Sequence, residues 1–590
     1  MNLLERTRLI AHLLRWRLTW SRRDIDYCPK HKPHKDPGRN LSDKFVSARE
    51  AAGLIPDGAT VLSCGLASHA RCSIFYWALR ELFEQTGHPS ALTWLSVGAQ
   101  GGRGKIPGTV EELGIPGLLQ CYISGHLETA KSLLRLADEG ELELQTLPQG
   151  EMTWLIEAQG RGEYTVTSDT GIGTFLDPRV GRGSRVTPKT QENLIELVNG
   201  DALGFSLPRI DVAVANLPYA DVDGNIYFQD SASLTESIEA VRAARHNGGK
   251  ALITVCDIID EDHDAVGLPA ESIDAIVVNP YNEQTGGVRQ RNPWKLFTPG
   301  GDGDDRKAEA RLKFINEILH ITPSRGPVEN ALARLGARVF TQAVSPPTVV
   351  NIGVGFPEEA ARLLSESDLH DDITFTTETG VYGGLPAPGV FFGAAVNPQR
   401  LETSAWMFHH YIEHLDATML GFLEVDSTGN VNVSKRGPRM LDYVGPGGFP
   451  SIVNSAKTIV LIGTWMANAN WRVDSGRLEL IKPGKPKFVE RVDEASFNGR
   501  VALARGKRVF YVTNVGVFTL TDAGLTLIEV MPGIDIERDI LDVSRAKIMI
   551  PTDREIRAVP ESVVTGNGFE LSWISEVSLC SDDCMTRRSL

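Results

Sequence analysis

IDVAVANLPYADVDGN at residues 210–225 returns as LDATMLGFLEVDSTGN at residues 415–430, and this repeated stretch decides the fold. Each copy has one aspartate before an apolar run and a second aspartate before a Gly-Asn turn. The matching positions, all 205 residues apart, are Asp211 and Asp416, Asp221 and Asp426, Gly224 and Gly429, and Asn225 and Asn430. Self-similarity at a fixed offset indicates duplicated structural units, so we expect two related domains.

Two further pairs of landmarks keep the same order along the chain. Upstream, Thr60-Val61-Leu62 with Gly65 pairs with Thr348-Val349-Val350 and Gly353 at an offset of 288; downstream, Asn247 and Lys250 pair with Asn454 and Lys457. The runs at 59–62, 210–214 and 251–255 are apolar on both faces, which is typical of parallel strands covered by helices. We therefore predict an α/β fold of two related open α/β/α domains with mostly parallel sheets, the first carrying about 83 extra residues.

Shifts in composition predict the domain boundaries. We expect a basic N-terminal extension at 1–42, an N-terminal domain at 43–297, a linker and helix at 298–330, and a C-terminal catalytic domain at 331–590. The linker starts with a polar, Gly-rich run at 298–305, and a charged helix is predicted over 306–320.

The overall composition is that of a globular protein with a full-sized core. Of 590 residues, 42% are hydrophobic and 23% charged, and the net charge is -15. Such an acidic chain repels phosphate backbones, which disfavours nucleic-acid binding. It has no uninterrupted apolar stretch of about 18 residues, so we expect no membrane span. Seven cysteines, an odd number, do not resemble a disulfide framework. We predict a cytoplasmic protein.

The first forty residues differ from the rest, because they hold ten Lys and Arg against four Asp and Glu. Leucines and Ile10 recur there at helical spacing with arginines between them (Leu3, Leu4, Leu13, Leu14, Leu18). A basic amphipathic helix suits a membrane surface, a targeting segment, or an extension that packs on its own protomer or a neighbour, and we favour packing. Cys28, His31 and His34 follow, but they lack a fourth zinc ligand.

Function is sought where the second half differs from the first. Glu378 ends a predicted strand, whereas the corresponding first-half position near Val97 has no acid. Asn432 corresponds to Tyr227 of the first half, and the turn Gly447-Gly448 corresponds to a predicted helical stretch at 237–241 that has no glycine turn. Ligands of open α/β sheets bind at the carboxyl ends of the strands, where all three features are expected to lie.

This combination indicates covalent catalysis by a carboxylate. Glu378 is ionised at neutral pH and needs no general base to act as a nucleophile. Backbone N–H groups must then stabilise the oxyanion. Two glycine turns are candidates, Gly447-Gly448 and Gly353-Val354-Gly355, and the second leads into a helix start at Pro357.

From these residues outward, the sequence resembles the family I coenzyme A-transferases, especially the single-chain type with fused α and β halves. The resemblance covers roughly 43–560 and is strongest at Thr377-Glu378-Thr379-Gly380 and in the segments 383–386 and 392–398. Further segments that resemble the family lie at 125–126, 147–150, 171–179, 447–449 and 532–535. The family includes acetate/propionate and 3-oxoacid CoA-transferases, which implies short-chain fatty acid or ketone body metabolism.

The resemblance implies a ping-pong transfer of coenzyme A from an acyl-CoA to a carboxylic acid through a glutamyl-CoA thioester on Glu378. Amides of Gly353, Val354, Gly355, Gly447 and Gly448 would bind oxyanions and CoA, and Asn432 would orient the reacting groups. CoA is expected mostly along the second half, with the acyl pocket between the halves. Coenzyme A is then a substrate, no tightly bound cofactor or metal is expected, and a homodimer or homotetramer is predicted by analogy.

Other functions stay open. An acyl-CoA hydrolase would use the same glutamate with water as acceptor, and a non-catalytic binding protein is possible because fold alone fixes no function. The run His410-x-x-Glu413-His414 spells an inverted zinc-protease motif where relatives carry a glycine-rich stretch. We disfavour the protease because the motif ends where a strand of the repeat begins.

Overall fold

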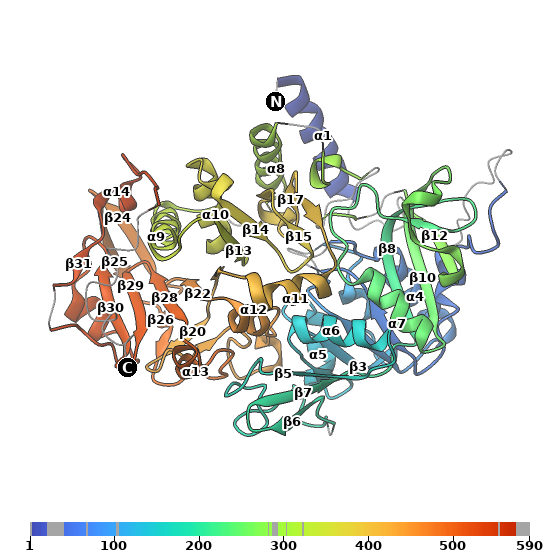
Figure 1. The fold of residues 1–590 in the computed structure, drawn as a ribbon, viewed down its shortest axis with the longest axis horizontal. Helices are drawn as coiled ribbons and strands as arrows, with labels where there is room; N and C mark the ends of the chain where they lie inside the picture. Colours follow the sequence, from blue (N-terminus) through green and yellow to red (C-terminus); the bar gives the residue numbers. More distant parts are fainter. Residues whose placement is uncertain are drawn as a thin grey trace, which may run out of the picture.

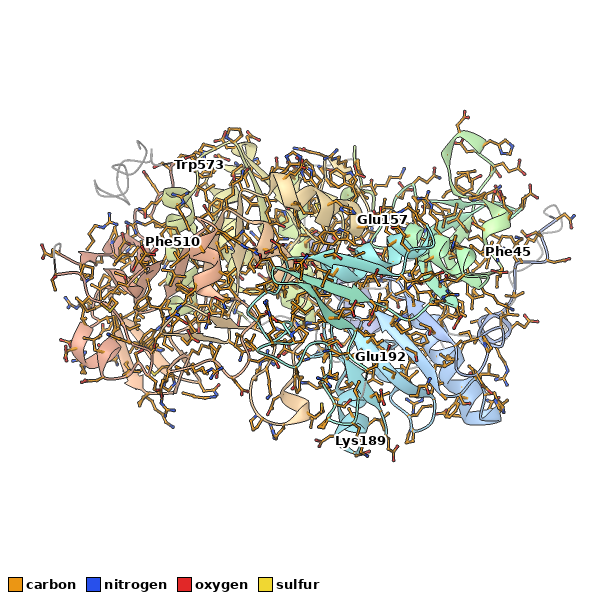
Figure 2. The ribbon with its side chains drawn as sticks, turned by 60° about the horizontal axis from the view of Figure 1, so that its bottom comes forward. Phe45, Glu157, Lys189, Glu192, Phe510 and Trp573 are labelled. Carbon is orange, nitrogen blue, oxygen red and sulfur yellow. The ribbon has the colours of Figure 1, made fainter. Side chains whose placement is uncertain are left out.

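The computed structural model shows two α/β domains side by side (Figure 1). It describes residues 3–19, 40–66, 69–101, 106–190, 192–280, 283–285, 293–301, 304–320, 324–552 and 555–573. No helix in these ranges is long and apolar enough to cross a membrane. Figure 2 shows Phe45 and Phe510 toward opposite ends of the molecule, and the two side chains belong to separate hydrophobic cores.

The first domain is built on a nine-stranded, mostly parallel sheet. Its parallel strands, in spatial order, are β12 (Ala275–Val278), β10 (Lys250–Ile258), β8 (Val212–Ala220), β1 (Thr60–Ser63), β2 (Leu92–Ser96), β3 (Leu119–Ser124) and β4 (Glu143–Gln145). Two short antiparallel strands, β9 (Ile226–Tyr227) and β11 (Val266–Leu268), complete the sheet.

Helices cover both faces of this sheet, because its strands are apolar on both faces. Val61 of β1 packs in one core with α3 (Ala48–Ala52), α4 (Ser73–Thr86) and α5 (Lys131–Asp138). Its neighbour Leu62 packs in the opposite core with α6 (Gln149–Gln159) and α7 (Ser237–His246). The predicted three-layer α/β/α architecture is therefore confirmed.

The second domain repeats this plan. Its sheet runs through the parallel strands β14 (Ile373–Thr376), β13 (Thr348–Ile352), β19 (Ala417–Leu420), β22 (Thr458–Ile462) and β28 (Arg508–Thr513). Antiparallel strands extend both edges: β15 (Val381–Tyr382) and β18 (Arg400–Leu401) on one, and β29 (Gly516–Thr521) and β30 (Gly524–Val530) on the other. Helices α9 (Pro327–Ala343) and α10 (Phe356–Glu366) cover one face, and α11 (Ser404–His414), α12 (Phe449–Ser455) and α13 (Gly499–Ala504) the other.

The repeated aspartates make equivalent hydrogen bonds in both domains. The carboxylate of Asp211 accepts from the backbone N–H of Thr60 at 2.8 Å, and that of Asp416 accepts from Val349 at 3.0 Å. Asp221 and Asp426 each accept from backbone N–H groups of the Gly-Asn turn that follows. The duplication is thus visible in individual hydrogen bonds.

The strand registers correct two of the sequence pairings by one residue. Val61 pairs with Val212 of β8, and Val350 pairs with Ala417 of β19, which lies 205 residues after Val212. Val350 is therefore the equivalent of Val61, and the offset between the first strands is 289 rather than 288. Likewise Lys250 is equivalent to Thr458 and not to Lys457. The loops that carry the identical residues can differ in length by one residue without disturbing the sheet. A one-residue slip within a strand would turn every buried side chain to the other face of the sheet, so the strand register decides which residues are equivalent.

Between β2 and β8 the first domain contains β3, α5, β4, α6 and a small antiparallel sheet of β5 (Thr165–Ser168), β7 (Ala202–Ser206) and β6 (Ile195–Asn199). The charged linker helix is α8 (Asp305–Leu319). Helix α9 starts at Pro327, before the domain boundary predicted at 331, and packs on β22 and β28 of the second domain. The basic N-terminal segment forms α1 (Leu3–Thr19), which contacts α8.

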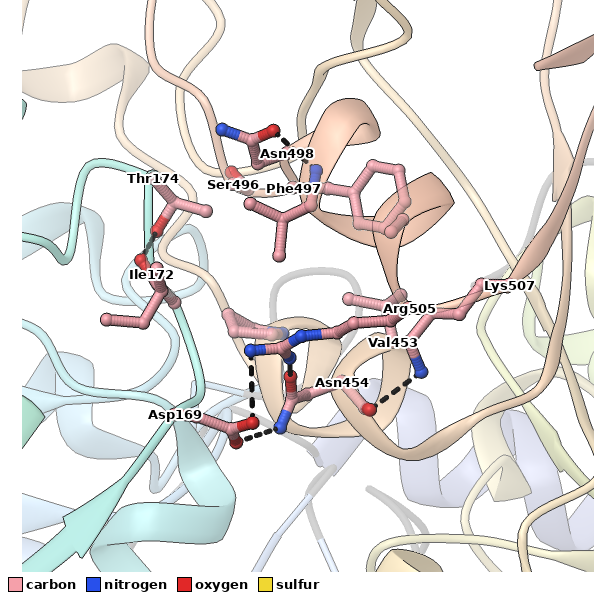
Figure 3. Close-up of a pocket in the computed structure, with 14 residues that line it drawn as sticks. Asp169, Ile172, Thr174, Val453, Asn454, Ser496, Phe497, Asn498, Arg505 and Lys507 are labelled. Carbon is pink, nitrogen blue, oxygen red and sulfur yellow. Dashed lines mark hydrogen bonds and ion pairs between the residues drawn. The ribbon is translucent and has the colours of Figure 1, made fainter. Parts of the chain in front are cut away.

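Direct contacts join the domains. Arg182 donates to both carboxylate oxygens of Glu494 at 2.8 and 2.9 Å. Figure 3 shows a second contact, where Asp169 of the first domain faces Asn454 and Arg505 of the second. The cavity beside this contact measures only about 40 Å³, so we regard it as part of the domain interface.

Candidate active site

Glu378 lies on a tight turn immediately after β14. The turn is closed by hydrogen bonds from Thr377 N–H to Val381 O and from Gly380 N–H to Thr377 O, both 3.1 Å. Gly380 has a φ of 98°, and a Cβ there would lie 1.8 Å from the carbonyl oxygen of Glu402. Only glycine fits this position, and the turn therefore presents Glu378 at the carboxyl end of the strand.

The carboxylate of Glu378 is half-buried and has no cationic partner among the residues that the structure describes. Burial raises its pKa above the ordinary value of 4.5, because a charged group loses hydration there. Two donors oppose this shift: the backbone N–H of Glu378 itself, and Asn351 Nδ2, which lies 3.4 Å from Glu378 Oε2. A carboxylate with these two donors and no counter-ion among the described residues is well suited to act as a nucleophile.

Asn351 belongs to a buried polar network that joins three strands and a helix. Its Nδ2 also donates to the Tyr411 hydroxyl at 3.1 Å, and its Oδ1 accepts from Thr418 Oγ1 at 3.3 Å. The Tyr411 hydroxyl in turn donates to Thr376 Oγ1 at 3.0 Å. Burial and the nearby Glu378 raise the pKa of Tyr411, so its hydroxyl stays neutral. The network fixes the orientation of the Asn351 amide toward Glu378.

The segment Gly353-Val354-Gly355 leads from β13 into α10, but its amides are not equivalent. Gly353 N–H donates to Met419 O at 2.8 Å, and Gly355 N–H donates to the carboxylate of Glu358 at 2.9 Å. In the described part of the chain, Val354 N–H has no hydrogen bond, and the Val354 residue is 52% exposed. Val354 therefore supplies the available donor of this segment, next to the positive end of α10.

In the second glycine turn, too, one backbone N–H is hydrogen-bonded and another is available. Gly447 N–H donates to Gly125 O of the first domain at 2.7 Å, whereas the Gly448 N–H finds no partner within the described ranges. A Cβ on Gly445 would lie 2.7 Å from Gly125 O, so this turn needs glycine for the close approach of the two domains. Of the five residues predicted to bind oxyanions, Val354 and Gly448 keep their N–H groups available.

Asn432 is completely buried, and its side chain holds a turn. Its Nδ2 donates to Glu424 and to Lys435 O, and its Oδ1 accepts from the N–H groups of Ser434 and Lys435. These four hydrogen bonds occupy the whole amide. Asn432 was predicted to orient the reacting groups. In the described structure its amide bonds to this turn, and the side chain that contacts Glu378 is Asn351.

Asn351 and Tyr411 were not identified from the sequence. Asn351 is the one polar residue after the first position in the apolar strand Thr348–Ile352, which is the signal that was available. Tyr411 lies inside the run that spells the zinc-protease motif. In that run His410 and His414 share one helix face, with ring centroids 4.5 Å apart. Among the described residues no group of three His, Cys, Asp or Glu is placed to hold a metal ion. Cys28, His31 and His34 lie outside those residues.

Two cavities meet at Val354. The smaller, about 330 Å³, has Glu378, Asn351, Gly447 and Gly448 in its wall, and its remaining lining is mostly apolar side chains of the second domain. The larger, about 1220 Å³, is lined by both domains and by α8. Val354 therefore lies in the wall of both spaces, whereas Glu378 lies in the wall of the smaller one.

The first domain also holds the turn that carries Glu378. Thr235 N–H donates to Thr379 O at 3.2 Å, and Ser404 N–H donates to Thr235 O at 2.8 Å. His69 Nε2 donates to Phe392 O at 2.7 Å, close to Gly393, whose carbonyl accepts from the hydroxyls of Thr377 and Thr379. The position of Glu378 thus depends on both domains.

Comparison with known proteins identifies the family. Residues 45–279 match the family model described as coenzyme A transferase. Caffeate CoA-transferase of Acetobacterium woodii is 32% identical over 515 residues, which cover 85% of this chain and 93% of the relative. Acetate CoA-transferase YdiF of Escherichia coli (strain K12) is 31% identical over 525 residues, covering 87% and 93%.

A solved structure agrees with this relationship. The acyl-CoA transferase YdiF of E. coli O157:H7, in a thioester complex with CoA, superposes with a TM-score of 0.76 at 28% identity, covering 90% of this chain and 98% of that one. The similarity extends along most of this chain and of each relative, and it shows the family. The chain belongs to the family I coenzyme A-transferases, enzymes that transfer coenzyme A from an acyl-CoA to a carboxylic acid.

Proposed function

We propose that this enzyme works by a ping-pong mechanism through a glutamyl-CoA thioester on Glu378. The observation that carries the proposal is the carboxylate itself: it lies in the wall of a cavity, lacks a cationic partner in the described structure, and adjoins backbone segments whose Val354 and Gly448 N–H groups are available. Catalysis by an ionised carboxylate needs both features, a reactive oxygen and donors for the developing negative charge.

In the first half-reaction, a Glu378 oxygen attacks the thioester carbon of the acyl-CoA. The C–S bond breaks, CoA leaves as a thiolate, and a mixed anhydride remains. The thiolate then attacks the Glu378 carbonyl carbon, which forms the glutamyl-CoA thioester and releases the acyl group as a carboxylate. No proton is gained or lost, which agrees with the lack of a general base in the contacts of Glu378.

The second half-reaction reverses these steps with a new carboxylate. This carboxylate attacks the glutamyl thioester, the CoA thiolate leaves, and the thiolate then attacks the acyl carbon of the anhydride. A new acyl-CoA departs and Glu378 is again a free carboxylate. Val354 N–H and Gly448 N–H stabilise the tetrahedral oxyanions, and Asn351 keeps the Glu378 carboxylate oriented and ionised.

The two cavities suit different parts of the substrates. We assign the reacting acyl groups to the smaller cavity, because Glu378 lies in its wall. We assign the phosphate-bearing part of CoA to the larger cavity, whose wall includes Lys131, Arg325 and Arg362. Binding of the long CoA chain away from the reacting carbon supplies energy that offsets distortion at the thioester.

A trapping experiment tests the covalent step. The enzyme is incubated with a short-chain acyl-CoA and no acceptor, and the peptide containing 371–390 is analysed by mass spectrometry. We expect a CoA adduct on Glu378, absent in Glu378→Gln. Glu413→Gln is the matched control, because the Glu413 side chain is 78% exposed on α11 and should leave adduct formation unchanged. An adduct elsewhere, or turnover that survives Glu378→Ala, contradicts the mechanism.

A second experiment separates transfer from hydrolysis at the same site. The enzyme receives an acyl-CoA together with a panel of free carboxylic acids, and both acyl-CoA products and free thiol are measured. Transfer predicts that CoA appears on an added acid with little free thiol. Release of free thiol at the same rate with and without acids would identify a hydrolase.

A further inference from the structure

Within the described part of the chain, helix α1 packs on α8 through one face. Leu13, which is 2% exposed, packs in a cluster with Leu312, Ile315 and Leu319 of α8. Arg17 Nη1 donates to Leu319 O at 2.8 Å, which secures the end of the helix. Figure 1 shows α1 beside α8 at the margin of the molecule. The opposite face of α1 is consequently turned away from the protein.

That opposite face is apolar. Its leucines are strongly exposed: Leu3 81%, Leu4 61%, Leu14 49% and Leu18 79%. At about 100° per residue, these four leucines with Thr7 and Ala11 fall within a stripe roughly 100° wide. Elsewhere in the described structure, large exposed hydrophobic residues are scattered, for example Val180, Ile412 and Ile481. Four exposed leucines on one short helix mark a binding surface.

The charges around the stripe restrict what can cover it. Arg8 borders one edge of the stripe, and α1 as a whole contains four arginines against one glutamate. The partner must therefore be apolar at its centre and negatively charged at its rim. A second copy of α1 would bring the same arginines and be repelled, whereas an anionic lipid bilayer offers both properties.

We propose that α1 docks the enzyme on the surface of an anionic lipid bilayer, with the leucine stripe in the interface and the arginines among the headgroups. The acidic body of the protein does not prevent this, since charges more than about 8 Å away are screened at physiological ionic strength. The helix lies on the membrane without crossing it. This docking is independent of the reaction at Glu378.

Vesicle flotation of the full-length enzyme tests the proposal. Vesicles of phosphatidylcholine alone are compared with vesicles containing about 30% phosphatidylglycerol, at low and high salt. We expect at least about tenfold more enzyme bound to the anionic vesicles, with binding reduced by high salt. Equal binding to both compositions, or none to either, overturns the proposal.

Two variants locate the surface. Leu3→Ser/Leu14→Ser/Leu18→Ser should lose about tenfold or more of the binding, and Leu197→Ser/Val198→Ser on β6 is the matched control that should keep it. Arg8→Glu should weaken binding to anionic vesicles only. CoA-transfer activity in solution is measured for every variant to verify folding. If the triple variant binds vesicles as the wild type does, or instead changes only the oligomeric state in light scattering, the membrane assignment is wrong.

Discussion

Replacement of Asn351 by leucine tests the assignment of Asn351, in place of Asn432, as the residue that positions Glu378. Leucine has a similar volume but no donor, so Asn351→Leu removes the hydrogen bond to Glu378 Oε2 and leaves the shape of the site nearly unchanged. Loss of a donor to the charged form disfavours the carboxylate relative to the carboxylic acid. The pKa of Glu378, already raised by burial, should therefore rise further.

The size of the effect follows from the geometry. A hydrogen bond to a charged group contributes about 1.5–3 kcal/mol, and the 3.4 Å donor–acceptor distance places this bond at the weak end of that range. Because one pKa unit corresponds to about 1.4 kcal/mol, we expect a rise of about one unit. In the proposed mechanism only ionised Glu378 attacks the thioester, so the variant should be about tenfold slower than the wild type below both pKa values and nearly equal well above them.

The assay is the pH dependence of kcat/KM for CoA transfer, measured for Asn351→Leu and for Asn432→Leu. The second variant is the control, since Asn432 is equally buried but bonds to Glu424 and a backbone turn. Both variants lose buried hydrogen bonds and some stability, but only Asn351→Leu should move the acid limb of the profile. A limb that moves in Asn432→Leu and stays fixed in Asn351→Leu would refute this assignment.

Two further predictions concern stability. Gly380→Ala should destabilise the protein by at least about 2 kcal/mol in denaturant titration, because the new Cβ would collide with Glu402 O and the φ is positive; an unchanged midpoint would show that the turn can relax. Arg182→Met should lower the melting temperature because buried Glu494 loses its bidentate partner; a variant that melts at the wild-type temperature would contradict this reason.

Much of the fold could be predicted from local sequence patterns. The doubly apolar runs correctly predicted parallel strands, and the Asp-to-Gly-Asn spacing correctly predicted the duplication, because these features depend on neighbours within a few residues. The helix of the linker and the amphipathic N-terminal helix were predicted for the same reason. The pairing offsets were wrong by one residue because register is set by hydrogen bonds between strands that lie far apart in sequence.

The candidate nucleophile, Glu378, was predicted from local sequence. Glu378 stands out because a carboxylate at the end of one domain's strand has no counterpart in the other, and the structure places it in a cavity wall, although its covalent role stays a prediction. Which backbone N–H groups of the glycine turns are available could not be predicted from local sequence. Whether Val354 or Gly355 has an available N–H depends on where Glu358, one turn into the next helix, directs its carboxylate.

The partners of Glu378 required the tertiary structure. Asn351, Thr376 and Tyr411 come from two strands and a helix, and they meet only when β13, β14 and α11 pack together. Asn432 has the residue type that suits the task, but its turn consumes all of its hydrogen-bonding groups. Residue type and spacing along the chain indicate which groups can do chemistry, whereas the pairing of their donors and acceptors is a property of contacts between distant segments, and those contacts exist only in the folded chain.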